Sequence, residues 1–126
     1  MKRGQIILEF MIIVCIALII LILFLKVIEG NVDELNNKND IFFIKEIAYK
    51  VKYEISTASE VKQGYKRNFV LPEKLDKKDY TIEIQENELI TKMGGWGFVL
   101  KIPETRGNII KGNNSIENIG GVVYLN

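Results

Sequence analysis

An uninterrupted apolar segment near the N-terminus constrains this chain more than any other feature. From Phe10 to Leu25 no side chain is charged, and Glu9 is the one charge if the run is extended back to Ile6. These twenty residues would form about 30 Å of helix, which matches the hydrocarbon thickness of a bilayer. We expect a membrane-spanning helix.

The insertion energy of this helix outweighs the cost of Glu9. Roughly 18 apolar residues contribute about −0.3 to −0.6 kcal/mol each, against about +3 kcal/mol or less for one carboxylate near a helix end. Lys2 and Arg3 precede the helix, whereas Lys26 is soon followed by Glu29. The positive-inside rule therefore predicts a cytoplasmic N-terminus, with residues from about 29 onward outside the cell.

Composition excludes several classes of function. The 126 residues include no His and a single Cys, which excludes Ser-His and Cys-His catalytic pairs, His-ligated metals, an intrachain disulfide and thiolate clusters. A net charge of +1 gives no electrostatic case for nucleic-acid binding. We expect no catalytic residue, no metal and no cofactor, and the chain is not expected to be an enzyme.

Two simpler interpretations of the apolar segment remain open at this point. A cleaved secretory signal peptide would have a shorter apolar region, of about 7–15 residues, and a small-x-small cleavage site. Residues 25–30 contain no such site. An uncleaved signal anchor fits the hydropathy equally well.

The residues that lead into the apolar helix distinguish these interpretations. They read Lys2-Arg3-Gly4-Gln5-Ile6-Ile7-Leu8-Glu9-Phe10. This pattern resembles the class III signal peptide of archaeal type IV pilin-like proteins, although Ile7 stands where the family often has a small hydroxyl residue. The resemblance implies that a prepilin peptidase recognises Lys2, Arg3, Gly4 and Gln5, cuts after Gly4 on the cytoplasmic side, and leaves the hydrophobic helix on the mature protein.

The resemblance also assigns Gln5, Glu9 and Phe10 to assembly. An ionisable group inside a spanning segment is costly and usually has a partner. In a filament, the new α-amine of Gln5 would pair with Glu9 of a neighbouring subunit. The alternative is that Glu9 lies at the headgroup level near the helix start, where a carboxylate favours the N-terminal dipole.

The resemblance implies a structural protein: a major or minor subunit of an archaeal type IV pilus-like surface filament, whose outer domain serves adhesion or surface contact. Its expected partners are the prepilin peptidase, a pilus assembly ATPase, a membrane platform protein, other pilin subunits and membrane lipid, with no nucleic acid. The expected location is a single-pass membrane protein that becomes part of a cell-surface filament. The alternatives are a single-pass anchored extracellular binding protein and a non-filamentous pseudopilin.

A second, amphipathic helix is expected after the membrane segment. An apolar stripe recurs at spacings of 3 and 4 and is made by Ile41, Ile44, Ala48, Val51, Ile55 and Ala58. Phe42, Phe43 and Ile47 widen this face, and Lys45, Glu46, Lys50, Lys52 and Glu54 surround it. The helix should reach about Lys62 before Gly64, and either Gly30-Asn31 or residues 36–40 could interrupt it.

From Tyr65 the pattern changes to the period of two that indicates β-strands. Strands are expected at residues 69–71, 80–84, 89–91, 96–102 and 122–125, with a turn at Glu86-Asn87. This region is also similar to the C-terminal β-region of small archaeal pilin-like proteins. Such short strands need the helix stripe to complete a core. The predicted fold is α+β: a long N-terminal hydrophobic helix continues into an amphipathic helix packed against a small antiparallel β-sheet head domain. The expected boundaries are a leader at 1–4, a membrane or filament-core helix at 5–28, the amphipathic helix at 29–64 and an extracellular β-domain at 65–126.

Two short motifs in the β-region have alternative interpretations. Gly94-Gly95-Trp96-Gly97 favours a hairpin turn with a tryptophan that anchors the sheet over a sugar or adhesion platform. Asn113-Asn114-Ser115 is a glycosylation sequon, expected in a Gly/Asn-rich loop, and Asn113 is the candidate acceptor.

Overall fold

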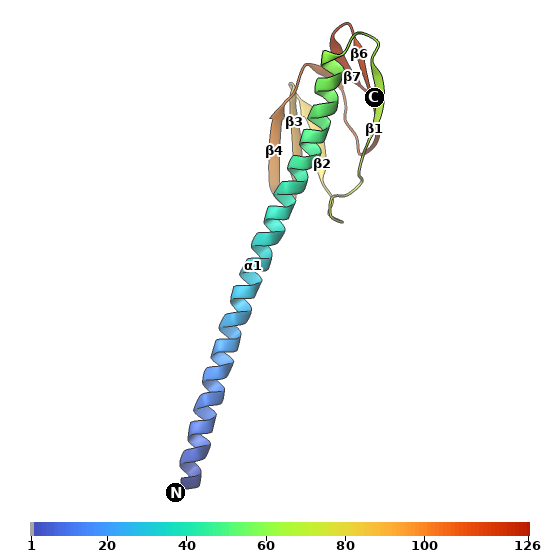
Figure 1. The fold of residues 1–126 in the computed structure, drawn as a ribbon. Helices are drawn as coiled ribbons and strands as arrows, with labels where there is room; N and C mark the ends of the chain where they lie inside the picture. Colours follow the sequence, from blue (N-terminus) through green and yellow to red (C-terminus); the bar gives the residue numbers. More distant parts are fainter. Residues whose placement is uncertain (1) are drawn as a thin grey trace. The chain divides into compact units, whose positions relative to one another are not determined.

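The computed structural model describes residues 2–126, so Met1, the first residue of the predicted leader, lies outside the described residues. The chain divides into two compact units, one ending at Asn36 and one from Asn37 to Asn126. Figure 1 shows the order of the elements: the helix α1 (Lys2–Glu60) contributes to both units, and every described strand lies in the second.

The helix α1 has no break at either of the two expected stretches. It runs through Gly30 and through residues 36–40 and ends at Glu60, two residues before the expected Lys62. A single internal glycine costs a helix only about 1 kcal/mol, which its neighbours can offset. The chain then turns at Gly64, whose φ of +90° a residue with a Cβ rarely adopts.

The carboxyl end of α1 is fastened by a side chain from the far end of the sequence. The Nδ2 atom of Asn118 donates hydrogen bonds to the carbonyl oxygens of Ala58 at 2.7 Å and Val61 at 3.2 Å. Its Oδ1 atom accepts a bond from the backbone N–H of Gly121 at 3.0 Å. Asn118 therefore satisfies two carbonyls that a helix end leaves without partners.

The strands of the second unit form two sheets. The first has the order β1-β6-β7-β5, and its strands are β1 (Lys66–Leu71), β5 (Thr105–Gly107), β6 (Gly112–Ile119) and β7 (Val122–Leu125). The second has the order β2-β3-β4, and its strands are β2 (Thr81–Gln85), β3 (Glu88–Met93) and β4 (Trp96–Lys101). All neighbouring strands pair antiparallel except β5 and β7, which are parallel.

Two-residue turns close the hairpins of the second sheet. Glu86 and Asn87 join β2 to β3 at φ values of 47° and 65°, as the sequence predicts for this turn. Gly94 and Gly95 join β3 to β4, and their φ values are 58° and 83°. Positive φ at both central positions is typical of the turns that match the twist of antiparallel strands.

The core lies between the second half of α1 and both sheets. The expected helix stripe is buried at Ile44, Ala48, Val51, Ile55 and Ala58. The sheets and loops bury Phe69, Leu71, Leu75, Tyr80, Leu89, Met93, Ile102, Ile109, Ile116, Val123 and Leu125 against it. The predicted α+β fold, with the helix packed against small sheets, is confirmed.

Several local expectations are wrong. Phe42 does not widen the buried face of α1, because it is exposed. Glu54, expected among the charges that surround the apolar stripe, is instead buried, with its Oε2 atom 3.4 Å from Nη1 of Arg67. The pKa of Arg67 is raised, first by a side-chain hydrogen bond with Tyr65 and then by the charge of Glu54.

Candidate functional site

The residues predicted as the processing site lie in the first turns of α1. Lys2, Arg3, Gly4 and Gln5 are helical and exposed. A Cβ atom added to Gly4 would have no heavy atom within 4 Å, so the fold does not itself require glycine at this position. Cleavage after Gly4 stays a prediction.

Two of the predicted assembly residues contact each other within the chain. The Nε2 atom of Gln5 donates a hydrogen bond of 3.3 Å to Oε1 of Glu9, one helical turn away. Phe10 is exposed beside them. An exposed amide–carboxylate contact of this kind contributes a few tenths of a kcal/mol at most. It leaves the carboxylate of Glu9 accessible to a cation from another molecule.

The segment from Ile6 to Ile28 exposes its large apolar side chains on every side of the helix. The helix is long and apolar enough to span a membrane, by length and composition. A helix that is apolar all round needs lipid or other helices around it. Nothing in its pattern of side chains selects one neighbour over another.

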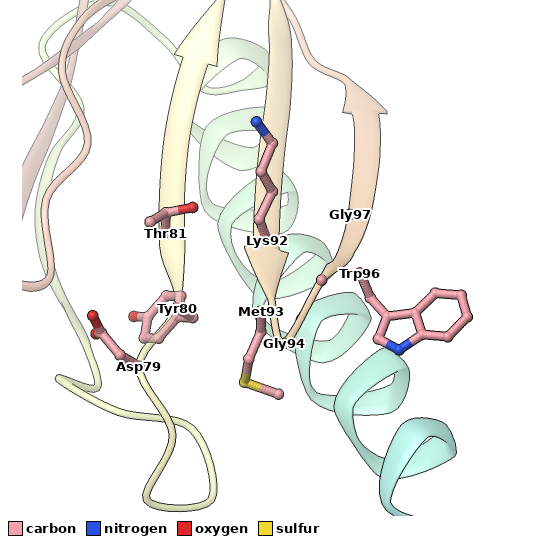
Figure 2. A pocket seen from close by; sticks show the side chains of 9 residues that line it. Asp79, Tyr80, Thr81, Lys92, Met93, Gly94, Trp96 and Gly97 are labelled. Carbon is pink, nitrogen blue, oxygen red and sulfur yellow. The ribbon is translucent and has the colours of Figure 1, made fainter. Parts of the chain in front are cut away.

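A pocket of about 440 Å³ opens at the end of the second sheet where β2 begins and β3 turns into β4 (Figure 2). Its walls are Asp79, Tyr80, Thr81, Lys92, Met93, Gly94, Gly95, Trp96 and Gly97. Lys92 also lies 3.8 Å from the carboxylate of Glu83. Figure 2 shows Tyr80 and Trp96 on opposite sides of Lys92 and Met93. The expected hairpin turn at Gly94-Gly95 is present. Trp96 does not anchor the sheet as expected, because the residue is 43% exposed and lies outside the buried core.

Tyr80 and its neighbours form the most perturbed group of titratable side chains. The hydroxyl of Tyr80 donates a hydrogen bond of 2.6 Å to the carbonyl of Pro72. Burial, with a smaller effect of the carboxylates of Glu73 and Asp79, raises the pKa of Tyr80 to about 12. Lys111 lies over the Tyr80 ring at 4.8 Å and hydrogen-bonds Asp79, which lowers the pKa of the Asp79 carboxyl. The group holds the pocket wall in place and is already paired internally.

A partly buried ion pair lies beside the same turn. The carboxylate of Asp40, on α1, accepts hydrogen bonds of 2.7 and 2.9 Å from Nζ of Lys78. A Cβ atom on Gly94 would approach Oδ2 of Asp40 to 2.7 Å. Gly94 is therefore required both by its positive φ and by this close approach.

The sequon lies on a strand and not in a loop. Asn113 is in β6, opposite Val70 of β1, with its side chain exposed. Its neighbour Asn114 points inward and is bonded to the backbone of Ile110 and to the side chain of Asn126. Glycosylation of Asn113 stays a prediction.

The sequence analysis missed the functional features that depend on distant residues. The pair of Asp40 and Lys78 joins residues separated by 38 positions, with no local pattern linking them. The exposed positions of Tyr49 and Tyr53 could have been found, because both lie on the side of α1 opposite the predicted stripe. Among residues 2–126, no group of three or more Cys, Asp or Glu side chains is placed to hold a metal ion.

Comparisons with protein-family models, with curated proteins and with solved structures found no match for the chain. The structure itself combines one long apolar N-terminal helix with a small β-sheet domain, an arrangement compatible with a pilin-like fold.

Proposed function

We propose that this chain is a structural subunit, major or minor, of an archaeal type IV pilus-like surface filament. A prepilin peptidase removes residues 1–4, the N-terminal helix carries assembly, and the β-domain faces outward for adhesion or surface contact. An assembly ATPase, a membrane platform protein and other pilin subunits complete the system. The chain acts structurally and not as an enzyme.

The observation that carries the proposal is a single carboxylate at the start of an exposed apolar helix. Glu9 lies within a segment of large apolar side chains and contacts the neutral amide of Gln5. A membrane anchor gains nothing from such a charge, which costs it up to about 3 kcal/mol. Cleavage after Gly4 would create a cationic α-amine on Gln5, and assembly would bring that amine to Glu9 of a neighbour.

The orientation of the helix supports the same proposal. Lys2 and Arg3 favour a cytoplasmic N-terminus, which is where the predicted cleavage must occur. The β-domain would then lie on the outer side of the membrane. After cleavage the helix keeps its whole apolar segment, which fits lipid before assembly and packed helices afterwards.

The experiment that tests the proposal measures the intact mass and N-terminal residue of the chain from membranes of cells with and without the prepilin peptidase. We expect a chain that starts at Gln5 only when the peptidase is present. A chain that starts at Met1 in both would refute processing and leave a single-pass anchor with an extracellular binding domain.

A pair of variants then tests assembly. Glu9→Ala should be cleaved and inserted normally but should form no filaments by electron microscopy. The control Glu73→Ala removes an exposed carboxylate from the head and should form filaments as the unaltered chain does. Normal filaments from Glu9→Ala would refute the pairing with Gln5. Correct cleavage without filaments from the unaltered chain would identify a pseudopilin.

A further inference from the structure

The single tryptophan of the chain projects from the head without a role in its core. Trp96 is the first residue of β4, is 43% exposed and lies outside the buried cluster. Figure 2 shows its ring pointing away from Tyr80. Tryptophan is enriched among the residues that dominate protein–protein contacts, because its ring supplies a large apolar area and its N–H one hydrogen bond.

A second pocket, of about 320 Å³, lies between α1 and the loop that follows β1. We name it the loop pocket. Its apolar lining includes Ile47 and Leu75, which are 5% and 8% exposed. The other residues that line it are Phe43, Glu46, Lys50, Pro72, Lys74 and Asp76. An apolar lining with charged groups at its edge suits a side chain that is itself apolar with one polar atom.

The loop that forms one wall of this pocket is held in place. Asp76 and Lys77 have φ values of 45° and 64°, and the residues on either side of them, Leu75 and Lys78, exchange two backbone hydrogen bonds. Lys78 is also paired with Asp40 of α1. The pocket therefore exists before any partner arrives, and a side chain that enters it need not order the loop.

Asp40 places Trp96 and the loop pocket at the same level of α1. Its carboxylate accepts hydrogen bonds from Lys78 of the loop. The same carboxylate lies 2.7 Å from the position that a Cβ atom on Gly94 would take, at the turn just before Trp96. The tryptophan and the pocket are thus tied to one residue of the helix.

The two features lie on opposite flanks of α1. Phe43 and Lys50 line the loop pocket. Lys45 and Tyr49, which contact Phe98 of β4, point to the other flank of the helix by its period of 3.6 residues. Figure 1 shows β4 and the loop between β1 and β2 on either side of α1. One copy can therefore offer its tryptophan on one flank and its pocket on the other.

The chemistry of the pocket edge matches an indole. The indole N–H is a donor with no acceptor of its own. Glu46 and Asp76 are exposed carboxylates at the edge of the loop pocket and can accept its hydrogen bond. Lys74, exposed at the same edge, is a cation that can lie over the ring.

We propose that Trp96 of one copy inserts into the loop pocket of a second copy. Copies that stand side by side in one membrane leave it at the same residue, so their Asp40 residues are level and the tryptophan meets the pocket. The two surfaces differ, so the contact is heterologous and passes from copy to copy. The inference deepens the proposed function and rests on it, because it names the contact between neighbouring heads of the filament.

Nitroxide quenching of tryptophan fluorescence in the full-length chain tests the contact. Every copy carries Cys15→Ala. The reporter copy keeps Trp96, whereas the labelled copy carries Trp96→Phe and a nitroxide on Glu73→Cys, an exposed position next to the pocket-lining Lys74. Only the reporter copy then has tryptophan fluorescence, so any quenching arises between copies.

In membranes that hold both copies, the label at position 73 should quench the fluorescence severalfold more than the same label on Lys62→Cys. Lys62 is exposed and lies after the end of α1, away from the loop pocket. No quenching, or equal quenching from the two positions, would overturn the proposal.

Variants of the labelled copy test the chemistry of the pocket edge. Glu46→Lys together with Asp76→Asn removes both acceptors and should lower the quenching severalfold. Glu60→Lys together with Glu104→Gln makes the same change of charge at exposed positions outside the pocket and should leave the quenching unaltered. Unaltered quenching with the first pair would overturn the contact.

The N-terminal residue and the presence of filaments are determined in the same samples. Copies that keep Met1 but show stronger quenching from position 73 would refute the filament and retain the contact. Copies that start at Gln5 and form filaments without this quenching would retain the filament and overturn the contact.

Discussion

Lys78 places its Nζ atom 2.7 Å from Oδ1 and 2.9 Å from Oδ2 of Asp40. The Asp40 side chain is 6% exposed, whereas the Lys78 side chain is 45% exposed and reaches in from a loop. That loop also holds the buried Leu75, which exchanges two backbone hydrogen bonds with Lys78. The ion pair therefore fastens the loop before β2 to the helix α1.

Lys78→Met should lower the free energy of unfolding of the second unit by about 1–3 kcal/mol, because it leaves a buried carboxylate without its cation. The exposure of Lys78 keeps the expected loss below that of a fully buried pair. Denaturant unfolding of the full chain in detergent micelles, followed by circular dichroism, measures it.

The matched controls for this prediction are Lys77→Met and the double variant Asp40→Asn with Lys78→Met. Lys77→Met removes a neighbouring exposed lysine and should change stability little. The double variant removes the buried charge as well and should recover part of the loss. Equal stability of Lys78→Met and Lys77→Met would contradict a stabilising role of the pair.

Asn118→Ala should destabilise the second unit by about 2–3 kcal/mol, because it leaves the buried carbonyl of Ala58 and the partly buried carbonyl of Val61 without their donor. Denaturant unfolding of the full chain in detergent micelles, followed by circular dichroism, measures this loss as well. Asn113→Ala, on the exposed face of the same strand, is the control and should lie within about 0.5 kcal/mol of the unaltered chain. A similar effect of both variants would show that the helix end needs no cap.

Gly107→Ala should destabilise by about 3 kcal/mol or more, or prevent folding. A Cβ atom at Gly107 would meet the backbone oxygen of Leu125 in the parallel pair of β5 and β7, where φ is +100°. Gly95→Ala has a similar φ of +83° with no atom in the way, so it should cost only about 1 kcal/mol. The thermal unfolding of Gly95→Ala should be measurable, whereas Gly107→Ala should be too unstable for the measurement. Equal losses of stability in the two variants would contradict the steric argument.

The parts of the fold that the sequence predicts correctly are those with a local pattern. The helix stripe from Ile44 to Ala58 and the alternation in β2 each follow from neighbouring residues. Strand β6 was missed because its inward positions include Asn114 and Asn118, whose polarity indicates a loop. Both side chains can be buried because they form hydrogen bonds with residues distant in the sequence: Asn118 donates to Ala58, and Asn114 accepts from Asn126.

The same distinction, between features with a local sequence pattern and features that depend on distant residues, applies to the candidate sites. The short motif around Gly4 and Glu9 lies on consecutive residues, so the sequence alone identifies it, although its function stays a prediction. The ion pair of Asp40 and Lys78 depends on which distant residues the tertiary fold brings together. The spacing of Phe42 from the stripe places it on the same side of α1 as Tyr49 and Tyr53, so its exposure could have been predicted from helical geometry.

The pKa of Tyr80 predicts how stability changes at high pH. Burial raises this pKa to about 12 from an ordinary value of 10.0, so the folded chain favours the neutral phenol. The stabilisation is fully present below pH 10, where the unfolded chain is also protonated, and is lost as the pH rises from 10 towards 12. Tyr80→Phe should lose about 1 kcal/mol at neutral pH with the hydrogen bond to Pro72, but its stability should fall less between pH 9 and pH 11.5. Tyr53→Phe, at an exposed position, should keep the full decline. Unfolding free energies at these two pH values provide the test, and an equal decline in both variants would mean that Tyr80 does not control it.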